Sequence, residues 1–161
     1  MLLESAKLER VEFSDDQIVG LWGKAIEAYT DSSSRPRSWN GQFRDLYESG
    51  RLAATAVVAA AGFRAKGTDH HRSVITAAAE LSPEEVAEAF YAVEGARGNR
   101  HDTNYGSADV VDEGDVAEIR EALGVLMAAG AKHLRSTRPS AKARIRVTHP
   151  GKRQEKAPAP D

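Results

Sequence analysis

Apolar residues recur at helical spacing in several stretches of the chain, and the first of these has a clear beginning. Ser14 can accept the N–H of the residue three positions later, where Gln17 completes a capping box. The apolar positions that follow share one face of a helix: Ile18, Trp22, Ala25, Ile26 and Tyr29. We expect this helix to end in the polar stretch 30–36, which is rich in serine.

The second stretch predicts the central helix of the fold. It begins at Ser38 or Asn40 and continues to Lys66. Its second half is almost entirely alanine and valine, so neighbouring elements should cover several of its sides at close range. Gly50 and Gly62 interrupt this helix, and each of them marks either a kink or a close crossing.

Three more helices follow. One is predicted from Thr68 to Leu81, and the next follows Ser82, which forms a second capping box and precedes a proline at the first helical position. Asp112 or a neighbour begins a long final helix that ends near Arg135. No segment alternates apolar and polar residues over several positions, so we expect no strands. The pattern predicts an all-α bundle of about five helices with short loops.

The pattern also divides the chain into an N-terminal arm (1–12), a helical bundle (13–137) and a C-terminal tail (138–161). The tail loses the apolar periodicity and holds several prolines, so we expect it to be disordered and dispensable for folding. It carries seven Lys/Arg and two Asp/Glu, a net charge of +5. Because the whole chain has a net charge of −2, residues 1–137 carry a net charge of −7. An acidic body argues against sequence-blind nucleic-acid binding by the folded surface, whereas the basic tail can add salt-sensitive attraction.

Composition narrows the class of protein. The chain has no cysteine, so it forms no disulfide, and a zinc site would need histidines and carboxylates alone. No apolar run approaches the roughly 18 residues of a membrane helix, and the first residues lack the pattern of a secretory signal. We therefore expect a cytoplasmic protein that does not associate with a membrane.

The stretch Arg97–Gly106 holds the densest polar chemistry of the chain. Its ten residues include two arginines, a histidine, an acid, two amides and a tyrosine. A guanidinium suits phosphate and carboxylate, a histidine can carry a proton near neutral pH, and a tyrosine offers a ring for stacking. The stretch predicts either a ligand site or a polar loop that caps its flanking helices.

Other chemistry has little support in the sequence. The adjacent His70 and His71 point to different sides of a helix, whereas metal ligands on a helix favour positions i and i+4. The sequence shows no glycine-rich phosphate loop, no serine nucleophile elbow and no helix with metal-ligand spacing. We therefore expect no metal and no cofactor.

Residues 38–136, with an alanine-rich central helix and an arginine motif before the last long helix, resemble the HEPN superfamily of prokaryotes. The motif of that family is an arginine and a polar residue, followed after four to six residues by a histidine. Arg100 matches the arginine and His101 its polar neighbour, whereas Tyr105 stands near the position of the histidine. The resemblance implies a homodimer in which two motifs face each other and cleave RNA without a metal.

The arginine-to-tyrosine pattern is similar to variant HEPN members that accompany small nucleotidyltransferases, which implies a non-catalytic partner in a toxin–antitoxin or defence pair. Arg100 would hold the phosphate of RNA or a nucleotide, beside Arg97, His101, Asn104 for hydrogen bonding and Tyr105 for stacking. The first alternative is a metal-independent ribonuclease that uses Arg100 and His101. His101 would carry the proton in place of Tyr105, because a tyrosine with a pKa of about 10 is a poor proton carrier near pH 7. The second alternative is a structural interaction module.

Overall fold

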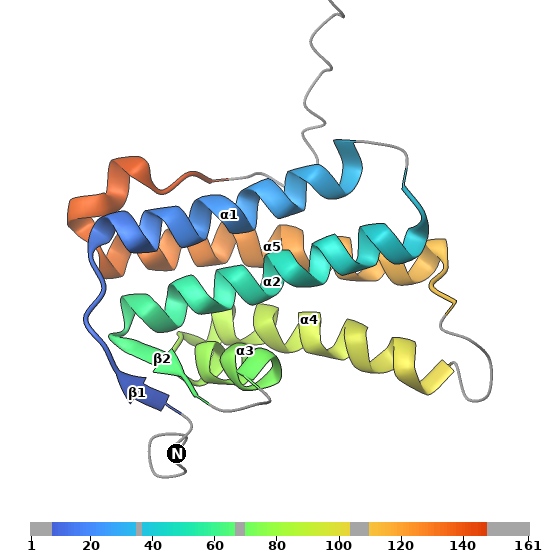
Figure 1. Cartoon of the computed structure of the whole chain (residues 1–161), viewed down its shortest axis with the longest axis horizontal. Coiled ribbons are helices and arrows are strands. Elements are labelled where there is room, and N and C mark those ends of the chain that lie inside the picture. The colour runs from blue at the N-terminus through green and yellow to red at the C-terminus, as the bar shows by residue number, and fades with distance from the viewer. Residues whose placement is uncertain (1–7, 35–36, 67–69, 104–109, 148–161) are drawn as a thin grey trace, which may run out of the picture.

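The computed structural model describes residues 8–34, 37–66, 70–103 and 110–147, without the side chains of 70–73 and 99–103. Five α-helices form a bundle, as the apolar pattern predicts, and a pair of short strands and a 3-10 helix lie at one end of it (Figure 1). The elements are β1 (Leu8–Arg10), α1 (Asp15–Ser34), α2 (Trp39–Ala60), β2 (Phe63–Ala65), α3 (His70–Glu80), α4 (Glu84–Thr103), α5 (Glu113–Thr137) and η1 (Pro139–Arg144). None of the described helices is long and apolar enough to cross a membrane.

Side-chain caps begin three of the helices where the sequence predicts them. Before α1, Ser14 Oγ accepts the N–H of Gln17 at 3.2 Å, and Gln17 Oε1 accepts the N–H of Ser14 at 2.9 Å. Ser38 is the N-cap of α2, because its Oγ accepts the N–H three residues later at 3.1 Å. Asp112 forms a capping box at the start of α5. These contacts are local, which is why the sequence reveals them.

Two helix ends differ from the prediction. α1 continues to Ser34 through the polar stretch that we expected to be a loop. Its hydroxyls donate to carbonyls three or four residues earlier, as Ser32 Oγ does to Tyr29 at 2.6 Å, and the buried Ser32 also accepts a bond from Arg120 of α5, a contact that no local pattern reveals. α2 ends at Ala60 instead of Lys66. Gly62 follows with a φ of 87°, a left-handed conformation that favours glycine, and it turns the chain into β2.

The expectation of no strands is wrong for two short segments. β1 and β2 pair antiparallel, with Leu8 opposite Ala65 and Arg10 opposite Phe63. Each strand has three residues, which is too short for an alternating pattern to appear in the sequence. Because Leu8 is buried in this pair, residues 8–12 belong to the fold and not to a separate arm.

α2 is the central helix, as predicted. It lies between the other helices and contacts α1, α3, α4 and α5 (Figure 1). Most of the small residues in its second half are buried. At Gly50 the neighbours approach so closely that an added Cβ would lie 3.1 Å from Val93 Cγ1 and 3.4 Å from Leu123 Cδ2. Gly50 therefore marks a close crossing of α2 with α4 and α5, whereas Gly62 marks the turn after the helix.

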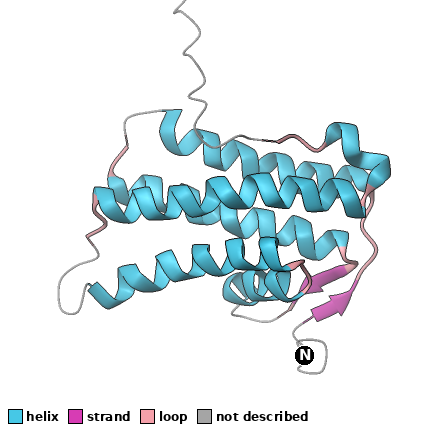
Figure 2. Cartoon of the chain, turned by 180° about the vertical axis from the view of Figure 1, so that it is seen from behind, coloured by secondary structure: helices cyan, strands magenta, loops and turns pink. Residues whose placement is uncertain are grey.

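The predicted boundary of a disordered tail at residue 138 is wrong. After α5 the chain forms η1 and packs back against the bundle (Figure 2). Ala141 and Ile145 of this segment are fully buried. The Trp22 indole N–H donates to the carbonyl of Arg146 at 2.9 Å, which ties this segment to α1. Single apolar residues between basic ones leave no helical periodicity, so their burial was not visible in the sequence. Residues 148–161 lie outside the described chain.

Candidate functional site

The first part of the polar motif is helical. α4 extends to Thr103, so Arg97, Arg100 and His101 lie in its last two turns and not in the loop that we predicted. Cationic residues near a helix C-terminus interact favourably with the helix dipole, which favours this extension over a loop. Asn104 and Tyr105 lie outside the described residues.

The helical register relates the three described backbone positions of the motif. Positions 97, 100 and 101 follow the spacing i, i+3 and i+4, which places them on one side of α4. The end of α4 lies at the same end of the bundle as the beginnings of α2 and α5 (Figure 1). The motif therefore forms one side of a helix end, with Arg97 closest to the packed part of the bundle.

Arg97 belongs to a three-residue cluster with Tyr47 of α2 and Glu94 of α4. The Tyr47 hydroxyl donates to Glu94 Oε1 at 2.9 Å, and Arg97 Nη1 lies 3.6 Å from Glu94 Oε2. The Arg97 guanidinium carbon also lies 5.3 Å from the centroid of the Tyr47 ring, which is a cation–π contact. Glu94 thus balances the charge of Arg97, and the cluster fixes the side of α4 that leads to Arg100.

The electrostatics of the cluster give Tyr47 a fixed protonation state. Burial raises the pKa of the Tyr47 phenol well above its usual value, and the charge and hydrogen bond of Glu94 raise the pKa further. Tyr47 therefore remains protonated near neutral pH and cannot act as a proton carrier there. It serves as a hydrogen-bond donor and as a stacking surface for Arg97.

Sequence reasoning singled out neither Glu94 nor Tyr47 as a functional residue. The two residues are 47 positions apart, and no local spacing connects them. The only signal in the sequence was an aromatic residue with a polar tip on the central helix, a position that also suits an ordinary core residue.

Arg120 holds three helices together at the same end of the bundle. Its Nη1 donates to Ser32 Oγ of α1 at 3.0 Å, and its Nη2 donates to Gln42 Oε1 of α2 at 3.1 Å. Ser32 is fully buried, and its hydroxyl both donates to the Tyr29 carbonyl and accepts from Arg120, which satisfies the buried group. Arg120 thus joins the end of α1 and the beginnings of α2 and α5 near the motif.

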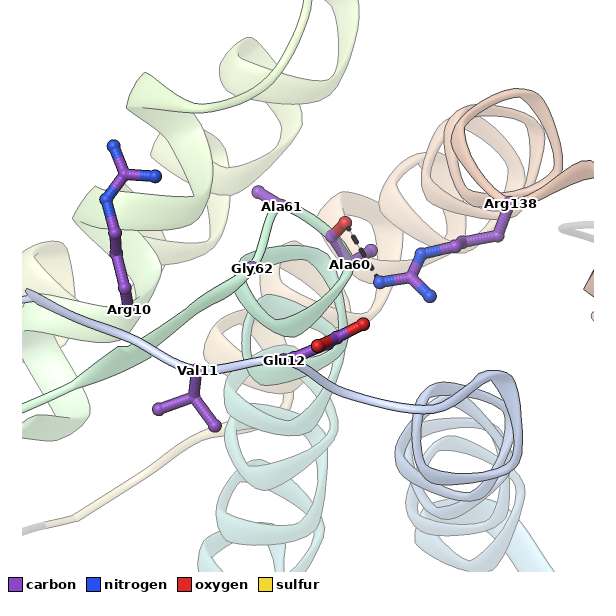
Figure 3. A pocket seen from close by; sticks show the side chains of 7 residues that line it. All are labelled: Arg10, Val11, Glu12, Ala60, Ala61, Gly62 and Arg138. Atoms are coloured by element: carbon purple, nitrogen blue, oxygen red, sulfur yellow. Dashed lines mark hydrogen bonds between the residues drawn. The ribbon is translucent and has the colours of Figure 1, made fainter.

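A shallow cavity of about 420 Å³ lies at the opposite end of the bundle, beside Gly62 and Arg138 (Figure 3). The Arg138 guanidinium donates to the carbonyl of Ala60 at 3.5 Å and to that of Phe13 at 3.2 Å, and it pairs with Asp15 at 3.2 Å. A cation at the last carbonyls of α2 is favourable for the helix dipole. Arg138 itself occupies this position, and its contacts beside the cavity anchor the C-terminal segment to the bundle.

Asp15 takes part in the same anchor. Its carboxylate accepts hydrogen bonds from the Ser140 hydroxyl and from Arg138. These two contacts, that of Ser140 first, hold the pKa of Asp15 below its usual value.

In the described part of the chain, no group of three or more histidines and carboxylates is arranged to hold a metal ion.

Comparisons with protein-family models, with curated proteins and with solved structures found no match for this chain. The resemblance to the HEPN superfamily therefore stays a prediction from the motif and the helix pattern. The functional proposal depends on the geometry of the described residues and on the chemistry of the motif.

Proposed function

We propose that the protein is a non-catalytic, HEPN-like component of a toxin–antitoxin or defence system that binds RNA or nucleotide phosphate through Arg100. The observation that supports this proposal is the fixed side of α4. The Tyr47 and Glu94 contacts hold Arg97, and positions 100 and 101 follow on the same side one turn later. A guanidinium presented from a fixed helix binds phosphate with less loss of conformational entropy than one on a flexible loop.

The cluster changes the role that we assign to Arg97. The sequence suggested that Arg97 binds substrate, but its charge is balanced by Glu94 and its guanidinium is stacked on Tyr47. We therefore assign Arg97 to positioning and Arg100 to phosphate binding. Asn104 and Tyr105 remain proposed contacts for hydrogen bonding and base stacking.

The proposal includes a homodimer, with a small nucleotidyltransferase-type protein as a further partner. One outward side of α4 supports the dimer: Tyr91 is 53% exposed, and Gly95 and Gly98 follow it at i+4 and i+7 with open space beside them. Such a side allows another helix to approach closely. A second copy, related by a two-fold axis, can pack on this side. Position 100 is nine residues from Tyr91, about half a turn of rotation, so each motif would stay on the other side of its own α4.

A structural interaction module is the second candidate. The observation that favours it is that Arg97, the motif residue whose side chain is described, is used inside the fold. In this case the end of α4 would stabilise the bundle and would not bind an anion.

The test is to measure binding and decay of a labelled single-stranded RNA by the purified protein in the presence of a chelator. The proposed function predicts binding without decay. Decay that is lost in His101→Ala would instead identify the metal-independent ribonuclease with Arg100 and His101 as catalytic residues. Neither binding nor decay would leave the structural module.

A further inference from the structure

A second basic site lies on the other half of α5. Here α5 and the segment around η1 line an open cavity of about 430 Å³, within the range of roughly 300–1,000 Å³ that is typical of small-molecule sites. Lys132, Arg135 and Ser136 of α5 and Lys142 of η1 supply its polar groups. Ala128 and Val147 supply apolar surface. The cavity thus combines three cations with an apolar wall.

The geometry of this cavity is fixed by the packing of the C-terminal segment. Arg135 Nε donates to the carbonyl of Lys142 at 3.0 Å, which holds η1 beside α5. Ile145, three residues after Lys142, is fully buried, and the carbonyl of Arg146 accepts a hydrogen bond from the Trp22 indole N–H. These contacts set the distance between the cations of α5 and Lys142.

The positive charge of the cavity is not balanced by the surrounding chain. No Asp or Glu lies between Glu121 and Glu155, a stretch that holds eight Lys/Arg. Two of these arginines, Arg138 and Arg144, pair with Asp15 and Asp16. Within the described ranges, no carboxylate pairs with Lys132, Arg135 or Lys142. A cavity lined by charges of one sign concentrates counter-ions, and an anion between the three cations would relieve their mutual repulsion.

His133 does not add to this charge at neutral pH. It lies on α5 next to Lys132, and burial lowers the pKa of its imidazole below the usual value. The imidazole is therefore largely neutral at pH 7, and the charge of the cavity comes from lysine and arginine.

We propose that this cavity is a binding site for phosphate groups. Lys132 of α5 and Lys142 of η1 would bind the anion from two sides, and Arg135 would donate hydrogen bonds from its terminal nitrogens. Charge-assisted hydrogen bonds from lysine and arginine to phosphate oxygens are among the strong ones in proteins. The Ser136 hydroxyl adds a neutral donor. The phosphate belongs either to a free pyrophosphate-type compound, including a nucleotide, or to an RNA backbone.

This site is independent of the one proposed at the end of α4. Glu113 and Lys132 are 19 residues apart on one helix, which corresponds to roughly 30 Å. Figure 1 shows η1 and the end of α4 at opposite ends of the bundle. Loss of RNA binding in Arg100→Ala therefore tests the first site, and a change in the lysines tests the second.

The experiment is calorimetric titration of the full chain with inorganic pyrophosphate. The test variant is Lys132→Gln/Lys142→Gln, and the matched control is Lys24→Gln/Lys66→Gln, which removes the same charge from exposed lysines outside the cavity. We expect wild type and control to bind with similar affinity and the test variant to bind about tenfold to hundredfold more weakly. Arg135→Lys adds a second test that keeps the charge but removes the fork, and it should also weaken binding.

Three results would overturn the proposal: no pyrophosphate binding by wild type, equal binding by wild type and the test variant, or equal weakening in both double variants, which would indicate general charge attraction. Competition identifies the source of the phosphate. A short single-stranded RNA that displaces pyrophosphate from wild type but not from Lys24→Gln/Lys66→Gln would contradict a local site. Displacement from both indicates the RNA backbone, and failure to displace indicates a small phosphate compound.

Discussion

Tyr47 connects the helix that carries the motif to the centre of the bundle. Its hydroxyl donates to Glu94 and its ring lies beside the Arg97 guanidinium, so one half-buried side chain restrains two residues of α4. The position of Arg100 depends on this restraint, because Arg100 lies only one turn beyond Arg97. A single phenol thus links core packing to the proposed binding function.

Replacing Tyr47 by Phe should therefore lower the free energy of unfolding by about 1 kcal/mol, because the half-buried Glu94 carboxylate loses a donor. Tyr91→Phe is the matched control, since Tyr91 lies on α4 with 53% of its surface exposed, and it should change stability by less than about 0.5 kcal/mol. Urea denaturation followed by circular dichroism measures both values. Equal stability of the two variants would contradict the structural role of the Tyr47 hydroxyl.

The raised pKa of Tyr47 also makes the contribution of this residue to stability depend on pH. The protonated phenol is favoured in the folded state, so the stability that it contributes is fully present below the unfolded value of about 10 and is lost as the pH rises through the folded value. Ultraviolet titration of the native protein should show a tyrosine component that ionises above the usual range of a phenol. That late component should vanish in Tyr47→Phe, and its persistence there would assign the shift to another tyrosine.

At the scale of elements, Gly130 of α5 lies against the ring of Trp22 of α1. A Cβ added there would lie 2.9 Å from Trp22 Cη2, and Trp22 cannot move easily because it is buried and bonded to the Arg146 carbonyl. Gly130→Ala should therefore cost about 1–3 kcal/mol.

The control for this substitution is Gly23→Ala, at a helical position of α1 with no neighbouring atom within 4 Å of the added Cβ. The higher helix propensity of alanine should raise stability there by about 0.5–1 kcal/mol. Opposite signs of the two changes in thermal unfolding would confirm the contact. A gain for Gly130→Ala would show that α1 and α5 are farther apart than described.

The segment after α5 also contributes to stability. Ile145 is fully buried, so Ile145→Ala should cost about 2–5 kcal/mol, whereas Val125→Ala on the exposed side of α5 should cost less than about 0.5 kcal/mol. The comparison uses the same unfolding measurement for both variants. No loss of stability in Ile145→Ala would return residues 138–147 to the disordered tail that the sequence suggested.

These elements also show why some features were predictable and others were not. Helix starts at Ser14, Ser38 and Asp112 depend on bonds to residues three positions away, so the sequence contains them. The strands pair across more than 50 residues, and the Trp22 to Arg146 bond spans 124 positions. The same limit applies to the site: the motif arginines were visible in the sequence, but the contact of Arg97 with Tyr47 exists only in the folded bundle.

For the molecule as a whole, we predict a homodimer through the outward side of α4. Sedimentation at micromolar concentration should give twice the monomer mass, and Gly95→Arg should shift the protein towards monomer because the long side chain blocks close approach. Gly20→Arg, on a similarly open position of α1, should leave the dimer intact. A wild-type monomer at this concentration would contradict the proposed homodimer.

The most direct test of phosphate binding at the end of α4 is the affinity of Arg100→Ala for single-stranded RNA. Loss of a charge-assisted contact should weaken binding about tenfold to hundredfold, whereas His101→Ala should have a much smaller effect. Arg64→Ala removes the same charge from an exposed residue of β2, at the other end of the bundle, and should bind like wild type. Circular dichroism confirms that each variant is folded. We predict weak binding by Arg100→Ala alone, and unchanged binding by this variant would contradict the assignment of Arg100 as the phosphate ligand.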